Sequence, residues 1–85
     1  MNEAVAQAVA EGNLYDMEDL VGSALGAGES PKSLLEAMMA GLRGCGDRFQ
    51  AGEFFLPELM GSADAFTAGM QVLAPHLAAG DRQSQ

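Results

Sequence analysis

Three of the four phenylalanines of this 85-residue chain lie within seven residues, at Phe49, Phe54 and Phe55, and Leu56 follows them directly. Gly52 lies among the rings, and a proline closes the segment. Connecting segments between helices are normally polar and solvated. Large apolar side chains in such a place either close the end of the domain, or meet another copy, or form a surface for a ligand.

Side chains for acid–base, nucleophilic or metal chemistry are few. His76 is the only histidine, and Cys45 falls on an apolar stripe, where a small buried side chain is typical. Glu53 and Glu58 flank the phenylalanines and have the chemistry of an acid–base pair, but a solvated helix start explains Glu58 more simply. No cluster of Cys, His or acids has the spacing of a metal site. We therefore expect no catalytic residue, no metal site and no enzyme activity.

The charge of the chain excludes several kinds of partner. Twelve acidic residues face four basic ones, and the net charge is -8. Binding to nucleic acid needs a basic face for the phosphates, and an anionic membrane surface attracts basic segments. No apolar run approaches the ~20 residues of a membrane span, and the N-terminus lacks the features of a secretory signal. The sequence predicts one small domain with neither nucleic acid nor membrane as a partner, in the cytoplasm.

The elements that position these residues are helices. Hydrophobic periodicity and capping signals predict four of them, at about residues 3–11, 13–26, 30–49 and 57–77. Asn2 and Ser30 are the expected caps, and Pro75 should kink or end the last helix because it removes a backbone hydrogen bond. Four amphipathic segments with short connections predict an all-α fold, an antiparallel four-helix bundle with a short first helix and two long C-terminal helices.

Apolar stripes predict which faces of these helices are buried. Three glycines, Gly41, Gly44 and Gly46, interrupt the third helix and indicate a close approach of another helix. The predicted stripe residues are Leu14, Met17, Val21 and Ala24 in the second helix, Leu35, Met38, Leu42, Cys45 and Phe49 in the third, and Leu59, Ala63, Phe66, Met70, Leu73 and Leu77 in the fourth.

The segment Gly46–Leu59, read with residues 27–32, 63–65 and 73–77, resembles the N-terminal helical cap of corrinoid proteins. These are the methyl-carrying proteins of methylamine, methanol and methoxy-aryl methyltransferase systems. The segment is also similar to the helical cap of cobalamin-dependent methionine synthase. The resemblance covers about residues 3–78, and its most specific part is the pattern Phe-x-x-Gly-Glu-x-Phe-Leu-Pro from Phe49 to Pro57.

The resemblance implies a function for the apolar residues. In that family the cap lies over the upper face of a corrinoid held by a following α/β domain, and apolar side chains shield the methyl group on cobalt. Phe49 and Leu56 match the two main covering positions, and Phe55, Met60 and Glu36 are further candidates. The implied cofactor is cobalamin, bound only together with the α/β domain, and the implied partners are that domain and a methyltransferase.

One half of the family pattern does not occur in this sequence. The corrinoid-binding half carries an Asp-x-His-x-x-Gly motif whose histidine ligates cobalt, and His76 lacks that context. We therefore expect residues 1–78 to form the cap domain, and residues 79–85 to be a flexible tail or the start of a linker to the absent domain. The alternative is a free-standing helical interaction or dimerisation module that binds a protein partner through its apolar corner. In either case the isolated chain is expected to form homo-oligomers through exposed apolar residues.

Overall fold

The computed structural model describes the backbone of residues 2–83 and the side chains of residues 2–78. Within these residues the chain forms helices and connecting turns, with no strand, so the predicted all-α class is confirmed. The predicted helices are all present, and their bounds agree with the sequence except at the C-terminal end of the last one. The helices are α1 (Glu3–Glu11), α2 (Leu14–Gly26), α3 (Pro31–Gln50) and α4 (Leu56–Gln83).

The helix ends form where the capping residues predict them. The Asn2 side chain accepts a hydrogen bond from the Val5 N–H at 3.1 Å, and the Ser30 hydroxyl accepts one from the Ser33 N–H at 3.1 Å. Each cap satisfies a backbone donor that the first turn of a helix leaves free. Gly12 ends α1 with a φ of 73°, a left-handed conformation that glycine adopts without steric cost.

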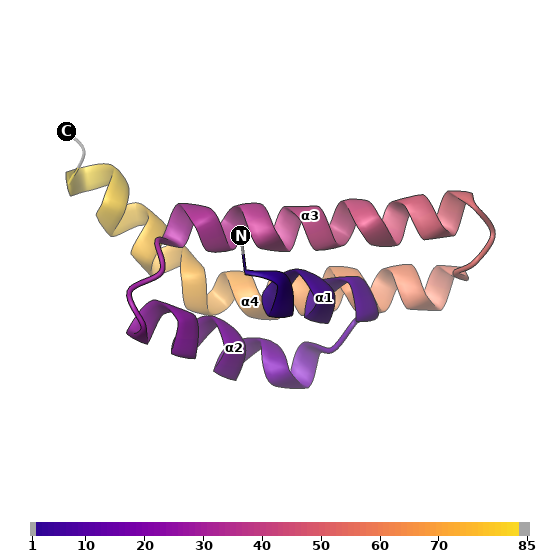
Figure 1. Cartoon of the computed structure of the whole chain (residues 1–85), viewed down its shortest axis with the longest axis horizontal. Coiled ribbons are helices and arrows are strands. Elements are labelled where there is room, and N and C mark those ends of the chain that lie inside the picture. The colour runs from indigo at the N-terminus through magenta and orange to yellow at the C-terminus, as the bar shows by residue number, and fades with distance from the viewer. Residues whose placement is uncertain (1, 84–85) are drawn as a thin grey trace.

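The four helices pack in two layers. α3 and α4 form a long antiparallel pair, while α1 packs along α3 and α2 along α4 (Figure 1). The consecutive helices α2 and α3 contact each other least, so they lie diagonally across the bundle. Because α1 and α2 are short, the α3–α4 hairpin projects beyond them at its turn (Figure 1). Side chains at that turn therefore have no second layer to cover them.

The core lies between the two layers. Most predicted stripe residues of α2, and Met38 and Cys45 of α3, are buried as expected. The predicted burial of Leu14 is wrong, since this residue is 36% exposed. The predicted burial of Phe49 is also wrong, because Phe49 lies on the projecting turn and is 41% exposed. The fully buried large side chains are Met17, Leu34, Met38, Leu73, Val5, Val9, Val21, Cys45 and Ser62.

In α4 the buried line is shifted from the predicted one. Ser62, Ala65 and Leu73 are buried together with Gly69, whereas Ala63 is exposed. Leu73 of the predicted stripe is buried as expected, but the other large residues of that stripe lie on the flanks and are half-buried, namely Leu59, Phe66, Met70 and Leu77. The physical reason is that α4 contacts three other helices, and small residues at its centre allow all of them to approach closely.

Glycines mark two of the close approaches. A Cβ atom at Gly41 would lie 2.8 Å from the Val9 Cβ and would also meet the carbonyl oxygen of Ala6, so α1 crosses α3 there. A Cβ at Gly69 would lie 2.6 Å from the terminal carbon of Met17. Gly44 and Gly46 have open space at the same position, so the predicted close approach is correct for Gly41 and wrong for the other two.

Pro75 does not end the last helix. α4 continues through it to Gln83, so it includes residues 79–83, which the sequence assigns to a tail or linker. The proline still removes one backbone donor from the helix. The ribbon of α4 changes direction toward its yellow end and leaves the bundle (Figure 1), as expected where a helical hydrogen bond is lost.

Candidate functional site

The turn between α3 and α4 has a fixed backbone. Gly52 has a φ of 81°, which favours glycine because a Cβ would be strained there. The Glu53 N–H donates to the Arg48 carbonyl at 2.9 Å, and the Gly52 N–H donates to the Phe49 carbonyl at 3.1 Å. These bonds satisfy the free carbonyls at the end of α3 and reverse the chain direction.

The start of α4 is fixed in the same manner. The Phe55 N–H donates to a Glu58 carboxylate oxygen at 3.3 Å, and the Phe55 carbonyl accepts from the Leu59 N–H at 3.3 Å. A glutamate at this distance from a helix start commonly closes the first turn. The Arg48 guanidinium lies 5.3 Å from the centre of the Phe54 ring, within the range of a cation–π contact. Phe54 is thus held against α3, and the residues after it turn outward.

Four apolar side chains stand open to solvent at this turn, and we refer to them together as the apolar corner. The exposed fractions are 41% for Phe49, 73% for Phe55, 58% for Leu56 and 60% for Met60. They come from the end of α3, the turn and the first turns of α4, which is the part of the hairpin that projects beyond the other layer (Figure 1). The corner therefore does not close the core of the monomer but presents an apolar surface outward.

The structure brings together four of the five residues that the resemblance singled out. The fifth, Glu36, is exposed on α3. It lies more than three helical turns before Phe49, roughly 20 Å along the helix at about 1.5 Å per residue. Glu36 is therefore not part of the apolar corner.

Reactive groups do not gather at the corner. The Cys45 thiol is fully buried, and His76 is exposed on the distant part of α4. Glu53 and Glu58 are both exposed, and the Glu58 carboxylate is used by the backbone of the turn. Across the described side chains, no three His, Cys, Asp or Glu residues are grouped so that they could hold a metal ion. What the corner offers is apolar area on a rigid backbone.

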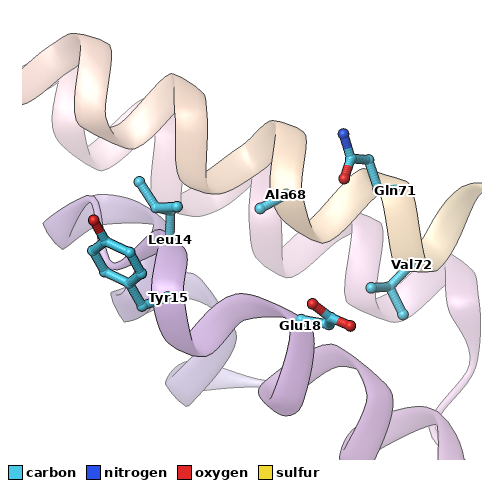
Figure 2. A pocket seen from close by; sticks show the side chains of 6 residues that line it. All are labelled: Leu14, Tyr15, Glu18, Ala68, Gln71 and Val72. Carbon is cyan, nitrogen blue, oxygen red and sulfur yellow. The ribbon is translucent and has the colours of Figure 1, made fainter.

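A second concave surface, which sequence reasoning missed, lies between α2 and α4. It is an open groove of about 420 Å³ lined by Leu14, Tyr15, Glu18, Ala68, Gln71 and Val72. In Figure 2, Val72 of α4 extends toward Glu18 of α2, whereas the Tyr15 ring points away from Val72 and the Gln71 amide points away from α2. The signal in the sequence was the position of Tyr15, the only tyrosine, which falls off the apolar stripe and beside acidic residues.

Comparison with known proteins places this geometry in a family. Residues 1–74 match the family described as B12 binding domain, and the chain belongs to that family. Among curated proteins it is similar to monomethylamine corrinoid protein 1 of Methanosarcina acetivorans, with 38% identity over 76 residues. It is also similar to the trimethylamine corrinoid protein of Methanosarcina barkeri, with 36% identity over 61 residues.

The structural comparison agrees with the sequence comparison. The fold matches the monomethylamine corrinoid protein of Methanosarcina barkeri with a TM-score of 0.85 and 32% identity. The match covers 88% of this chain and 36% of that protein, and the monomethylamine relative from Methanosarcina acetivorans is covered to 35%. The chain thus corresponds to about a third of these proteins, and the expected helical cap fold is confirmed.

The helices were also compared with the length and hydropathy of membrane spans. Within the part of the chain that the structure describes, no helix is both long enough and apolar enough to cross a bilayer.

Proposed function

We propose that this chain is the cap of a corrinoid methyl carrier and that its apolar corner covers the upper face of the corrinoid. The observation that carries the proposal is the exposure of Phe49, Phe55, Leu56 and Met60 on one rigid turn. Several large apolar side chains exposed at one turn of a small domain are typical of an interaction site. Membership of the B12 binding domain family supports a corrinoid as the group to be covered.

The residues of the apolar corner are suited to covering a corrinoid but not to binding it on their own. Phe and Leu side chains make an apolar surface that matches the flat face of a macrocycle, and among the four corner residues only Met60, through its thioether, has a group able to ligate a metal. When bound by the partner domain, the corrinoid would supply the cobalt that carries the methyl group. The chain's own contribution is to exclude water from that face, which protects reactive groups from side reactions.

The proposal includes the arrangement of the parts. Residues 1–78 form the cap, and residues 79–85 begin the connection to a corrinoid-binding α/β domain. The chain itself is not a catalyst, because a partner methyltransferase performs the transfer. That partner needs access to the corrinoid, so the cap must move aside, which requires a modest and reversible interface. The proposal also includes a location in the cytoplasm.

A chimera tests the proposal directly. The helical part of the Methanosarcina barkeri monomethylamine corrinoid protein is replaced by this chain, since the two folds superpose over 88% of this chain. The chimera is loaded with reduced cobalamin, and its oxidation in air is followed by visible absorbance. Phe49→Ala and Leu56→Ser should each speed oxidation, because each removes apolar contact worth about 1–2 kcal/mol. This corresponds to a roughly five- to thirtyfold larger open fraction.

The control variant is Met39→Ala. Met39 is an apolar side chain with 44% exposed, on α3 and outside the corner. Its truncation should leave the oxidation rate within about twofold of the unmodified chimera, since only losses near 1.4 kcal/mol give tenfold effects. If the corner variants and the Met39→Ala variant oxidise at the same rate, the covering role is refuted.

The second candidate is an interaction module that pairs with another copy through the same corner. The exposure of 73% at Phe55 and 58% at Leu56 favours it in the isolated chain, where no corrinoid domain covers them. Pairing through the corner and covering a corrinoid are mutually exclusive, because both occupy the same side chains.

A further inference from the structure

The groove between α2 and α4 has an apolar floor and a polar rim. Ala68 and Val72 lie on the α4 side, and Leu14, with 36% exposed, lies on the α2 side. Tyr15 is 87% exposed at one end of the groove with its ring turned away from Val72, and the Glu18 carboxylate lies on the rim beside Val72 (Figure 2). None of these residues belongs to the apolar corner, so the groove is a separate surface.

The charge around the groove has one sign. α2 carries Asp16, Glu18 and Asp19 and no basic residue, and all three are exposed. The cations among the described side chains, Lys32, Arg43 and Arg48, all belong to α3, and α3 is the helix that α2 contacts least. Glu18 is the one carboxylate that lines the groove itself, and together with the neighbouring acids of α2 it complements a partner with apolar side chains flanked by Lys or Arg.

The shape of the groove suits a helical partner. α2 and α4 run side by side (Figure 1), and a helix is one form of partner that lies in a groove between two helices. Amphipathic helices bind such grooves through a few apolar anchors on one face. Tyr15 adds a large, exposed aromatic side chain at the end of the groove, a residue type that is enriched in binding hot spots.

We propose that the α2–α4 groove binds a basic amphipathic helix of a partner protein. The apolar face of that helix lies on Leu14, Ala68 and Val72, and its Lys or Arg side chains meet Glu18 and the neighbouring acids of α2. This inference goes beyond the proposed function, because the corner and the groove do not share a residue. A partner docked at the groove leaves the corner free to cover or uncover another surface.

Tyr15 is an intrinsic fluorescent probe for binding at the α2–α4 groove. The chain has one tyrosine and no tryptophan, so its intrinsic tyrosine fluorescence reports the surroundings of Tyr15 alone. Two synthetic helical peptides without Tyr or Trp serve as ligands. They share one leucine face and differ only in having Lys or Glu beside it. The Lys peptide should change the emission saturably, and the Glu peptide should not.

Two substitutions with the same change in net charge separate groove binding from general attraction to an acidic protein. Glu18→Gln should weaken binding of the Lys peptide about two- to fivefold, as expected for the loss of one exposed ion pair. Asp47→Asn is the control, because Asp47 is an exposed acid on α3 away from the groove. It should change the affinity by less than about twofold, and added salt should weaken binding for every variant.

A third variant tests the aromatic anchor with a labelled Lys peptide and fluorescence anisotropy. Tyr15→Ala should weaken binding by about tenfold or more, the range of a hot-spot residue. Circular dichroism should show unchanged helicity, since Tyr15 is almost fully exposed. The inference is overturned if both peptides bind equally, if Glu18→Gln and Asp47→Asn weaken binding equally, or if Tyr15→Ala binds as tightly as the unmodified chain.

Discussion

Replacing Gly41 and Gly44 separately by alanine provides a sharp test of how α1 packs on α3. The two glycines lie on the same helix, less than one turn apart, and neither has a positive φ. Alanine is favoured over glycine in a helix interior by about 1 kcal/mol. With no packing effect, both substitutions should therefore stabilise the protein equally.

The surroundings of the two positions make the expected results differ in sign. At Gly44 the new methyl group meets nothing within 4 Å, so Gly44→Ala should stabilise the protein by about 1 kcal/mol. At Gly41 it meets the Ala6 carbonyl oxygen and lies 2.8 Å from the Val9 Cβ, both on α1. A backbone oxygen cannot rotate away, and overpacking costs about 1–3 kcal/mol. Gly41→Ala should therefore be destabilising by up to about 2 kcal/mol net of the helix gain.

Urea and thermal unfolding followed by circular dichroism measure both free energies. A change of 1 kcal/mol moves the Tm of a domain of this size by about 4–8 °C. Gly44→Ala should therefore raise the Tm and Gly41→Ala should lower it, and the Tm values of the two variants should differ by at least about 4–8 °C. Gly69→Ala gives an intermediate case, because the obstructing atoms are the flexible ends of Met17 and Met38. If Gly41→Ala and Gly44→Ala raise the Tm by the same amount, the close α1–α3 crossing is incorrect.

Two further predictions concern the helix cap and the corner. Ser30→Ala should destabilise the protein by about 0.5–2 kcal/mol, because it removes the acceptor of the Ser33 N–H, whereas Ser33→Ala in the same turn should cost less in the same unfolding experiment. The isolated chain should self-associate with rising concentration in sedimentation experiments, and Phe55→Ser should weaken this association because Phe55 is 73% exposed. A strictly monomeric chain at millimolar concentration, or oligomers indifferent to Phe55→Ser, would contradict the second prediction.

The helices and their ends could be predicted because they depend on local chemistry. Asn2 and Ser30 cap the first turn in the same way in almost any fold, and Gly12 and Gly52 end or reverse helices because they adopt positive φ. The Phe-x-x-Gly-Glu-x-Phe-Leu-Pro pattern likewise located the turn where the exposed apolar residues gather. Each of these features involves residues that are close in sequence.

Apart from Leu73, which is buried as predicted, the buried line of α4 could not be predicted from residue size. The sequence pattern favours the large residues Leu59, Phe66 and Met70, but the helix presents Ser62 and Gly69 to its neighbours. Which side chains meet depends on the order of the helices in space. That order, with α2 and α3 on a diagonal, results from packing between distant segments and leaves no local signal.

The exposure of the corner has the same origin. Phe49 continues the apolar spacing of α3, and nothing in that spacing says that α1 and α2 end before reaching it. The groove beside Tyr15 was missed for a related reason, since it exists only because α2 and α4 lie side by side. Local patterns therefore identify the chemistry of a surface, while its accessibility depends on how far the neighbouring helices extend.

The continuity of α4 has a mechanical consequence. One helix begins at Leu56 in the corner and passes Pro75 to Gln83, so any bending of α4 at the proline would move the corner relative to the residues beyond it. The segment between Leu56 and Pro75 is about 28 Å long at about 1.5 Å per residue. A rotation of only about 10° at the proline would carry the corner roughly 5 Å, enough to break van der Waals contact with any surface it covers.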